Sequence, residues 1–199
     1  MLISHEGKSP KVDPSAWIAP DATVCGDVTI GAGTRVMHGA RLIGEGGGAI
    51  SIGRNCIVME NAVIRASARH DCSIGDHCLI GPQTHVTGAA IEDEVFVATG
   101  ASVFHGARIG RGAEVRINAV VHIKTVLEAG ATVPIGWVAV GDPAELFPAD
   151  RHDEIWARQA PLDFPGWVYG LDRTKPGLMV EITRRLSDEL GRHRTDGVE

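Results

Sequence analysis

The sequence predicts an all-β solenoid, a parallel β-helix of about six triangular coils, followed by C-terminal α-helices. Three observations lead to this fold class. Aliphatic residues recur every six positions, small residues recur at a fixed offset from them, and aromatic residues make up 5% of the chain while glycine accounts for 25 of 199 residues. A core with so few rings must be filled by aliphatic side chains, and a fixed period of this kind is typical of repeat proteins.

The six-residue period covers 19 positions, and each of them holds Ile, Leu or Val. Two loops and one five-residue step interrupt the series without destroying it. The positions are Ile18, Val24, Ile30, Val36, Leu42, Ile52, Val58, Ile64, Ile74, Ile80, Val86, Ile91, Val97, Val103, Ile109, Val115, Val121, Leu127 and Val133.

The residue four positions after each aliphatic is usually small, as in Ala40, Ala62 and Ala101. A glycine often follows the aliphatic on every third hexad, so the repeating unit is 18 residues, or one triangular coil. Stacked coils pair through backbone hydrogen bonds about 4.8 Å apart, with the aliphatics filling the prism. Apolar stripes at helical spacing are absent from this region. The repeat therefore predicts a β-helix domain over residues 18–141.

Segments outside the repeat are expected to form an N-terminal segment, residues 1–17, and a helical extension, residues 142–199. Within the extension we expect one helix over 149–159 and a Pro/Gly connector over 163–167. A second helix is expected over 175–192. It would carry Met179, Ile182, Leu186 and Leu190 on one apolar face, and the last residues after it are expected to fray.

Composition excludes several classes of protein. No apolar run reaches 18 residues and the first ten residues do not resemble a signal peptide, which predicts no membrane partner. The net charge of −6, without a basic cluster, argues against nucleic-acid binding. Four cysteines are too few for a disulfide scaffold, and we expect a cytoplasmic protein. Cys56 and Cys78 fall at inward positions, whereas Cys25 falls on the outside of a coil, where exposure is expected.

Four segments resemble the γ-class carbonic anhydrases of the hexapeptide-repeat superfamily. They are WIAPDATVCGDVTIG (17–31), SIGRN (51–55), IGDHCLIG (74–81) and VGDPAEL (140–146). The resemblance covers about residues 9–147. It implies a left-handed coil, a C-terminal helix along the prism and a homotrimer. It also implies active sites in clefts between subunits, with zinc held by three histidines.

The positions that the resemblance assigns to zinc ligands hold other residues here. They are Arg65 after the Asn-x-Val-Ile pattern, and Pro82 and Thr87 in the segment that matches Gly-His-x-x-x-x-His-Gly. The Arg-Gly-Asp segment of the family reads Ile43-Gly44-Glu45, and its Gln-Asp pair reads Met59-Glu60. Proline has no side-chain donor, a guanidinium repels a metal, and threonine is a poor zinc ligand. The sequence therefore predicts no metal at this site, no cofactor, and no hydration of carbon dioxide.

The cleft itself is expected to persist with a new lining. Arg65 would bind an anion by its bidentate fork, and Glu60 with His85 or His70 would move protons. The structural alternative is a salt bridge between Arg65 and Glu60. The predicted substrate-binding residues are Arg65, Thr87, Met59, Ile43 and Pro82, and the predicted catalytic residues are Glu60, Arg65, His85 and His70.

Three functions remain open at this stage. The first is a metal-independent enzyme that acts on a small anionic metabolite between the subunits of a homotrimer. The second is a hexapeptide acyltransferase that uses coenzyme A or acyl carrier protein donors, with His70 as the candidate base. The third is a non-catalytic binding or structural subunit. The tail over 160–199 could cover the cleft or bind a partner.

Overall fold

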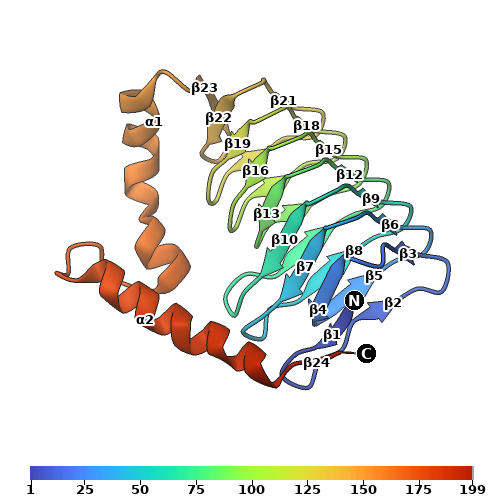
Figure 1. Ribbon diagram of the computed structural model, residues 1–199. Helices are drawn as coiled ribbons and strands as arrows, with labels where there is room; N and C mark the ends of the chain where they lie inside the picture. Colours follow the sequence, from blue (N-terminus) through green and yellow to red (C-terminus); the bar gives the residue numbers. More distant parts are fainter. Residues whose placement is uncertain (199) are drawn as a thin grey trace.

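A computed structural model describes residues 1–198 and confirms the solenoid. Its strands form three parallel sheets that wrap a triangular prism. Two helices stand beside one of these sheets (Figure 1), and the two ends of the chain meet at the first coil. None of the helices in residues 1–198 combines the length and apolar character that a membrane span needs.

The largest sheet faces the C-terminal helices and holds ten strands. Antiparallel strands close both of its ends: β23 pairs with β22, and β24 pairs with β1. Its strands, in spatial order, are β23 (Glu145–Pro148), β22 (Trp137–Val140), β19 (Val120–Val121), β16 (Ser102–Val103), β13 (His85–Thr87), β10 (Val63–Ala66), β7 (Arg41–Gly44), β4 (Thr23–Gly26), β1 (Leu2–Ser4) and β24 (Gly197–Val198).

The other two sheets hold seven parallel strands each. One contains β2 (Lys11–Val12), β5 (Val28–Ile30), β8 (Ile50–Ile52), β11 (Cys72–Ile74), β14 (Ala90–Ile91), β17 (Arg108–Ile109) and β20 (Val126–Leu127). The other contains β21 (Thr132–Val133), β18 (Glu114–Val115), β15 (Phe96–Val97), β12 (Leu79–Ile80), β9 (Ile57–Val58), β6 (Arg35–Val36) and β3 (Trp17–Ile18).

The predicted aliphatic positions stack in register inside the prism. Leu42 pairs with Ile64, and Ile64 pairs with Val86, with all three side chains fully buried. The small residues Ala40 and Ala62 are buried beside them. Because alternate residues of a strand point to opposite faces, the residues between the aliphatics are held on the outside in vertical columns.

At one corner of the prism the coils approach so closely that only glycine fits, and the glycines there form a stack. A Cβ placed on Gly31 would lie 2.6 Å from the carbonyl oxygen of Gly53, and a Cβ on Gly53 would lie 2.6 Å from that of Gly75. Any larger residue would force the coils apart at this corner.

The solenoid has about eight turns, not six, because one coil comes before Val24 at the N-terminal end and β22 begins a further turn after Val133. β1, β2 and β3 belong to that coil, and Leu2 and Val12 pair with Val24 and Ile30 of the next one. Residues 5–10 bulge out between β1 and β2 and displace the six-residue period. The segment 1–17, predicted to lie outside the β-helix, is thus part of it.

The C-terminal segment contains the two expected helices in shorter form, α1 (His152–Gln159) and α2 (Leu178–Leu190). Residues 163–167, expected to be a connector, contribute to a π-helical turn over Pro165–Tyr169. For residues 192–198 the expectation of fraying is wrong, since Gly191–Thr195 forms a 3₁₀ helix that leads into β24, and residue 199 lies outside the described residues.

The apolar face predicted for the second helix is partly confirmed. Ile182 is buried, but Met179 is 63% exposed. Figure 1 shows the start of α2 away from the solenoid and its end beside β24, so the first turn has no surface to pack against.

We predict that core and surface isoleucines differ sharply in their contribution to stability. Ile64→Ala should reduce the free energy of unfolding by about 2–5 kcal/mol, because it leaves a cavity in the prism. The matched change Ile135→Ala, at a side chain 61% exposed, should change it by less than about 0.5 kcal/mol. Chemical denaturation measures both, and equal losses would contradict the assigned register.

Candidate functional site

A column of outward side chains runs along the face that the tail covers. Arg65 is in register with Ile43 in one direction and with Thr87 in the other. The ladder continues to Phe104 and His122, each one position after an inward valine. Arg65 and Thr87 are therefore direct neighbours in one outward column.

The tail closes this face into a cavity of about 420 Å³. The solenoid contributes Arg65, His85, Thr87, Phe104 and His105 to its wall. Opposite them, the tail contributes mostly apolar side chains, among them Phe164, Tyr169, Ile182 and Leu186. A largely apolar cavity of this size with a few polar groups is typical of small-molecule sites.

Arg65 forms an ion pair with Glu45, which comes directly after β7. Glu45 is 8% exposed, and its second oxygen lies 3.2 Å from Nε2 of His193 in the tail. Arg65 thus forms its salt bridge with Glu45, and not with Glu60 as the structural alternative predicted. The sequence held a signal for this, because Glu45 occupies the acidic position of the family segment at residues 43–45.

Two imidazoles in the cavity wall have lowered pKa values. Burial lowers the pKa of His85, and the nearby Arg65 charge adds to the effect. Burial lowers the pKa of His105 to about 4, with further contributions from His70, His85 and Arg65. Nε2 of His105 lies 3.4 Å from Oγ1 of Thr87. Both rings are therefore neutral near pH 7 and able to accept a proton.

Arg69, on the loop between β10 and β11, adds a cation to the rim of the cavity. Within residues 1–198 it forms neither an ion pair nor a side-chain hydrogen bond, in contrast to Arg65 and Arg185, which both bind glutamates. Its guanidinium is the group most available to an incoming anion. No sequence motif marks Arg69 or His105 as a site residue.

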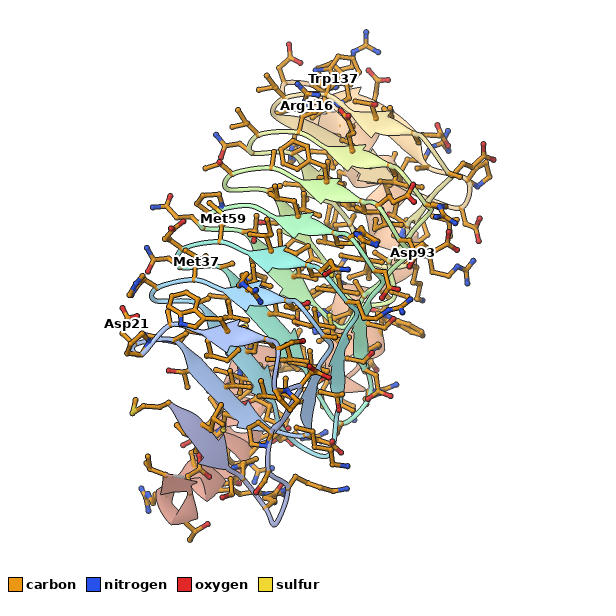
Figure 2. The ribbon with its side chains drawn as sticks, turned by 90° about the vertical axis from the view of Figure 1, so that its right-hand side faces the viewer. Asp21, Met37, Met59, Asp93, Arg116 and Trp137 are labelled. Carbon is orange, nitrogen blue, oxygen red and sulfur yellow. The ribbon has the colours of Figure 1, made fainter. Side chains whose placement is uncertain are left out.

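Several predicted site residues lie outside this cavity in the single chain. Met59, Glu60 and Pro82 sit at turns of the prism and do not line it. Figure 2 shows Met59 on an edge of the solenoid in line with Met37, with the C-terminal helices behind the prism. Ile43 neighbours Arg65 in the column but also lies outside the cavity lining.

His70 also lies outside the cavity lining and packs within the tail contact. Its ring centre is 5.1 Å from that of His105 and 5.1 Å from that of Trp167. Burial lowers the pKa of His70, and the Arg69 charge lowers it further. His70 therefore supports the wall of the cavity from behind.

A second cluster of ligand-type side chains lies where the chain ends meet. His5, His193 and Asp196 bring three potential metal-ligand atoms within 4.8 Å of one another. Cys25, expected to be exposed, is 3% exposed because the tail covers it, and its sulfur lies 3.7 Å from Asp196. The prediction that the chain binds no metal is not supported by this geometry, although the cluster is separate from Arg65, Pro82 and Thr87.

No family model matches the sequence. The chain is 30% identical over 160 residues to the mitochondrial gamma carbonic anhydrase 1 of Arabidopsis thaliana, which covers 77% of this chain and 56% of that protein. The chain thus spans little more than half the length of that relative. It is 26% identical to the carnitine operon protein CaiE of Salmonella agona over 187 residues, 91% of this chain and 90% of the relative.

Solved structures support the fold. A putative acetyltransferase from Bacillus cereus superposes with a TM-score of 0.54, at 23% identity, over 83% of this chain and 94% of the other. At this identity the likeness extends to the solenoid architecture alone.

We predict that His105 titrates near pH 4 in the folded protein, measured by NMR of its ring protons. A histidine whose pKa is lower when folded favours the folded state above its unfolded pKa of about 6.5. Its contribution is lost as the pH falls from about 6.5 to 4. The free energy of unfolding should therefore decline less steeply over this window in His105→Asn than in the parent chain. A His105 titration above pH 6 would contradict the buried placement.

Proposed function

The chain is a γ-carbonic-anhydrase-like protein of the hexapeptide-repeat left-handed β-helix superfamily, and from this premise we propose that it is an enzyme that binds a small anionic metabolite with an apolar body. The proposed site is the cavity between β10, β13, β16 and the tail. The observation that carries the proposal is that neutral imidazoles and an unpaired guanidinium share one mostly apolar cavity.

The donor set supports chemistry without zinc at the position that the resemblance implies. Of the three residues there, Pro82 offers no side-chain donor and Arg65 is a cation already paired with Glu45. Thr87 is a hydroxyl whose oxygen lies beside His105. These residues do not fit a three-histidine zinc, so no step of the proposed mechanism uses one.

In this proposal the arginines bind the anionic group of the substrate. A carboxylate or phosphate accepts two parallel hydrogen bonds from a guanidinium, and such charge-assisted pairs are stronger than neutral ones. Arg69 is available for this directly, and Arg65 lies in the wall beside His85. The apolar side chains of the tail would cover the rest of the ligand and exclude water.

In this proposal His85 and His105 transfer the protons. Because burial lowers the pKa of both rings, each is a neutral acceptor at physiological pH. A substrate held by its anionic group at Arg69 would present an acidic C–H, O–H or N–H to one of these rings. The reaction class is acid–base chemistry, such as isomerisation, elimination or cyclisation.

The acyltransferase alternative has less support. Its candidate base, His70, packs against Trp167 outside the cavity lining. The non-catalytic alternative is a protein that binds the same ligand and does not convert it.

A homotrimer is the second part of the proposal. The outer face of the sheet that contains β9, β12 and β15 carries a ladder of apolar side chains: Ile57, Leu79 and Phe96 are neighbours in register. An apolar ladder on the outside of a solenoid is suited to contact with another copy. Such a contact could bring Met59, Glu60 and Pro82 of one copy toward the cavity of the next.

We predict that benzoate binds the full chain and its neutral isostere benzamide does not. Benzoate combines a carboxylate with an apolar ring, matching the arginines and the tail side chains. Arg69→Gln should weaken benzoate binding about tenfold or more, because it removes a hydrogen bond to a charged group. Isothermal titration calorimetry measures the affinity.

The matched control is Arg108→Gln, an exposed arginine paired with Asp142 on another sheet, which should leave the affinity unchanged. Equal binding of benzoate and benzamide, or equal loss in both variants, would contradict the anion site. Binding of small carboxylates without turnover of any of them would favour the non-catalytic alternative.

We predict that the molar mass measured by sedimentation is three times the mass of one chain. Leu79→Glu should dissociate the trimer, because it places a charge in the middle of the apolar ladder. Ile135→Glu, at a residue 61% exposed elsewhere, is the control and should leave the mass unchanged. Analytical ultracentrifugation tests both, and a monomeric parent chain would overturn this part of the proposal.

A further inference from the structure

The two ends of the chain meet in a cluster of side chains that the proposed function does not use. His5 follows β1, Cys25 lies on β4, and His193 and Asp196 come from the last turn before β24. His5 and Cys25 are each 3% exposed, so the solenoid side of the cluster is buried. The tail side is half-buried, which leaves a path for an ion to enter.

The geometry of the cluster converges on one point. Nδ1 of His5 lies 2.7 Å from Oδ1 of Asp196, and Nδ1 of His193 lies 2.7 Å from Oδ2 of the same carboxylate. The two rings are stacked, with centroids 4.1 Å apart. Ligand atoms around tetrahedral zinc lie about 3.3 Å from each other, since each bond is about 2.0–2.1 Å. Small side-chain shifts would therefore open this cluster enough to admit the ion.

The far nitrogen of each histidine faces a carboxylate. Nε2 of His193 lies 3.2 Å from Glu45, and Nε2 of His5 lies 3.7 Å from Glu6. Histidines that bind metals usually donate their second N–H to such an outer acceptor, which fixes the tautomer. Here Glu45 favours the His193 tautomer that leaves Nδ1 free for a metal, whereas Glu6 is too far from His5 for a hydrogen bond and adds only a nearby negative charge.

Cys25 lies beside the three convergent ligands, outside the group whose donor atoms are within 4.8 Å of one another, and we assign it as the fourth donor through its contact with Asp196. Its sulfur lies 3.7 Å from Oδ2 of Asp196 on the inner side of the cluster. Two imidazoles, one carboxylate and one thiolate form a donor set suited to zinc, which accepts nitrogen, sulfur and oxygen ligands in a tetrahedron.

We propose that His5, Cys25, His193 and Asp196 bind a zinc ion that fastens the C-terminal tail to the first coils of the solenoid. The site is separate from the column of Arg65 and serves a structural purpose. Glu45 connects the two places, because it contacts both His193 and Arg65. Zinc binding would therefore hold the tail over the cavity.

The test uses the full chain, stripped with a chelator, loaded with zinc chloride and dialysed, with zinc measured by elemental analysis. We expect one zinc per chain in the parent protein. His193→Asn and Asp196→Asn should each weaken zinc binding about tenfold or more, as judged by competition with a coloured chelator. The matched control, His152→Asn, lies on exposed α1 and should retain full binding.

Two further measurements separate this site from any other metal site. Cobalt chloride in place of zinc should produce a cobalt–thiolate absorption band that Cys25→Ser abolishes. Zinc should also slow trypsin cleavage after Arg192 and Arg194 in the parent chain but not in Asp196→Asn. If the parent chain retains no zinc, or if a His193→Asn/Asp196→Asn double variant retains as much, the proposal is wrong. Both substitutions lie on the tail, outside the solenoid core, so the test does not depend on variants of buried His5.

Discussion

The structure depends on the vertical stacking of aliphatic side chains inside the prism. Each inward Ile, Leu or Val lies directly over the equivalent residue of the previous coil, as Leu42, Ile64 and Val86 do. Burial of these side chains and backbone hydrogen bonds between coils stabilise the same register. That register fixes which side chains point outward, and so it places Arg65 beside Thr87 in one column. The candidate site is a consequence of a repeat that evolved to fill a core.

The tail turns this outer face into a binding site. A flat parallel sheet offers no enclosed volume, and the cavity exists because Phe164, Ile182 and Leu186 return across the column. The tail is held at its far end, where β24 pairs with β1 and His193 contacts Glu45. Residues from both ends of the chain thus determine whether the cavity is covered.

The sequence predicted the solenoid well because a strict period of six leaves a strong pattern. The first coil escaped prediction because the bulge at residues 5–10 shifts that period between Leu2 and Val12. The column of Arg65 and Thr87 follows from the repeat, because each residue comes directly after an aliphatic position, Ile64 or Val86. The contacts of Glu45 and His105 do not follow from the repeat, because they depend on how loops and tail fold over the face, although the family segment at residues 43–45 marks Glu45 as its acidic position. Cys25 and His193 are 168 positions apart in sequence, and no local pattern indicates that they approach one another.

The antiparallel strands at both ends of the largest sheet also protect the molecule from unlimited growth. A parallel β-helix presents unpaired backbone groups at its first and last coils, and these edges could pair with another copy to extend into a fibre. Here β24 occupies the edge of β1 and β23 occupies that of β22. Both capping strands run against the direction of the sheet, so a further parallel coil cannot be added there in register. The chain after the repeat, which contains both β23 and β24, therefore blocks this mode of growth at both edges of the largest sheet.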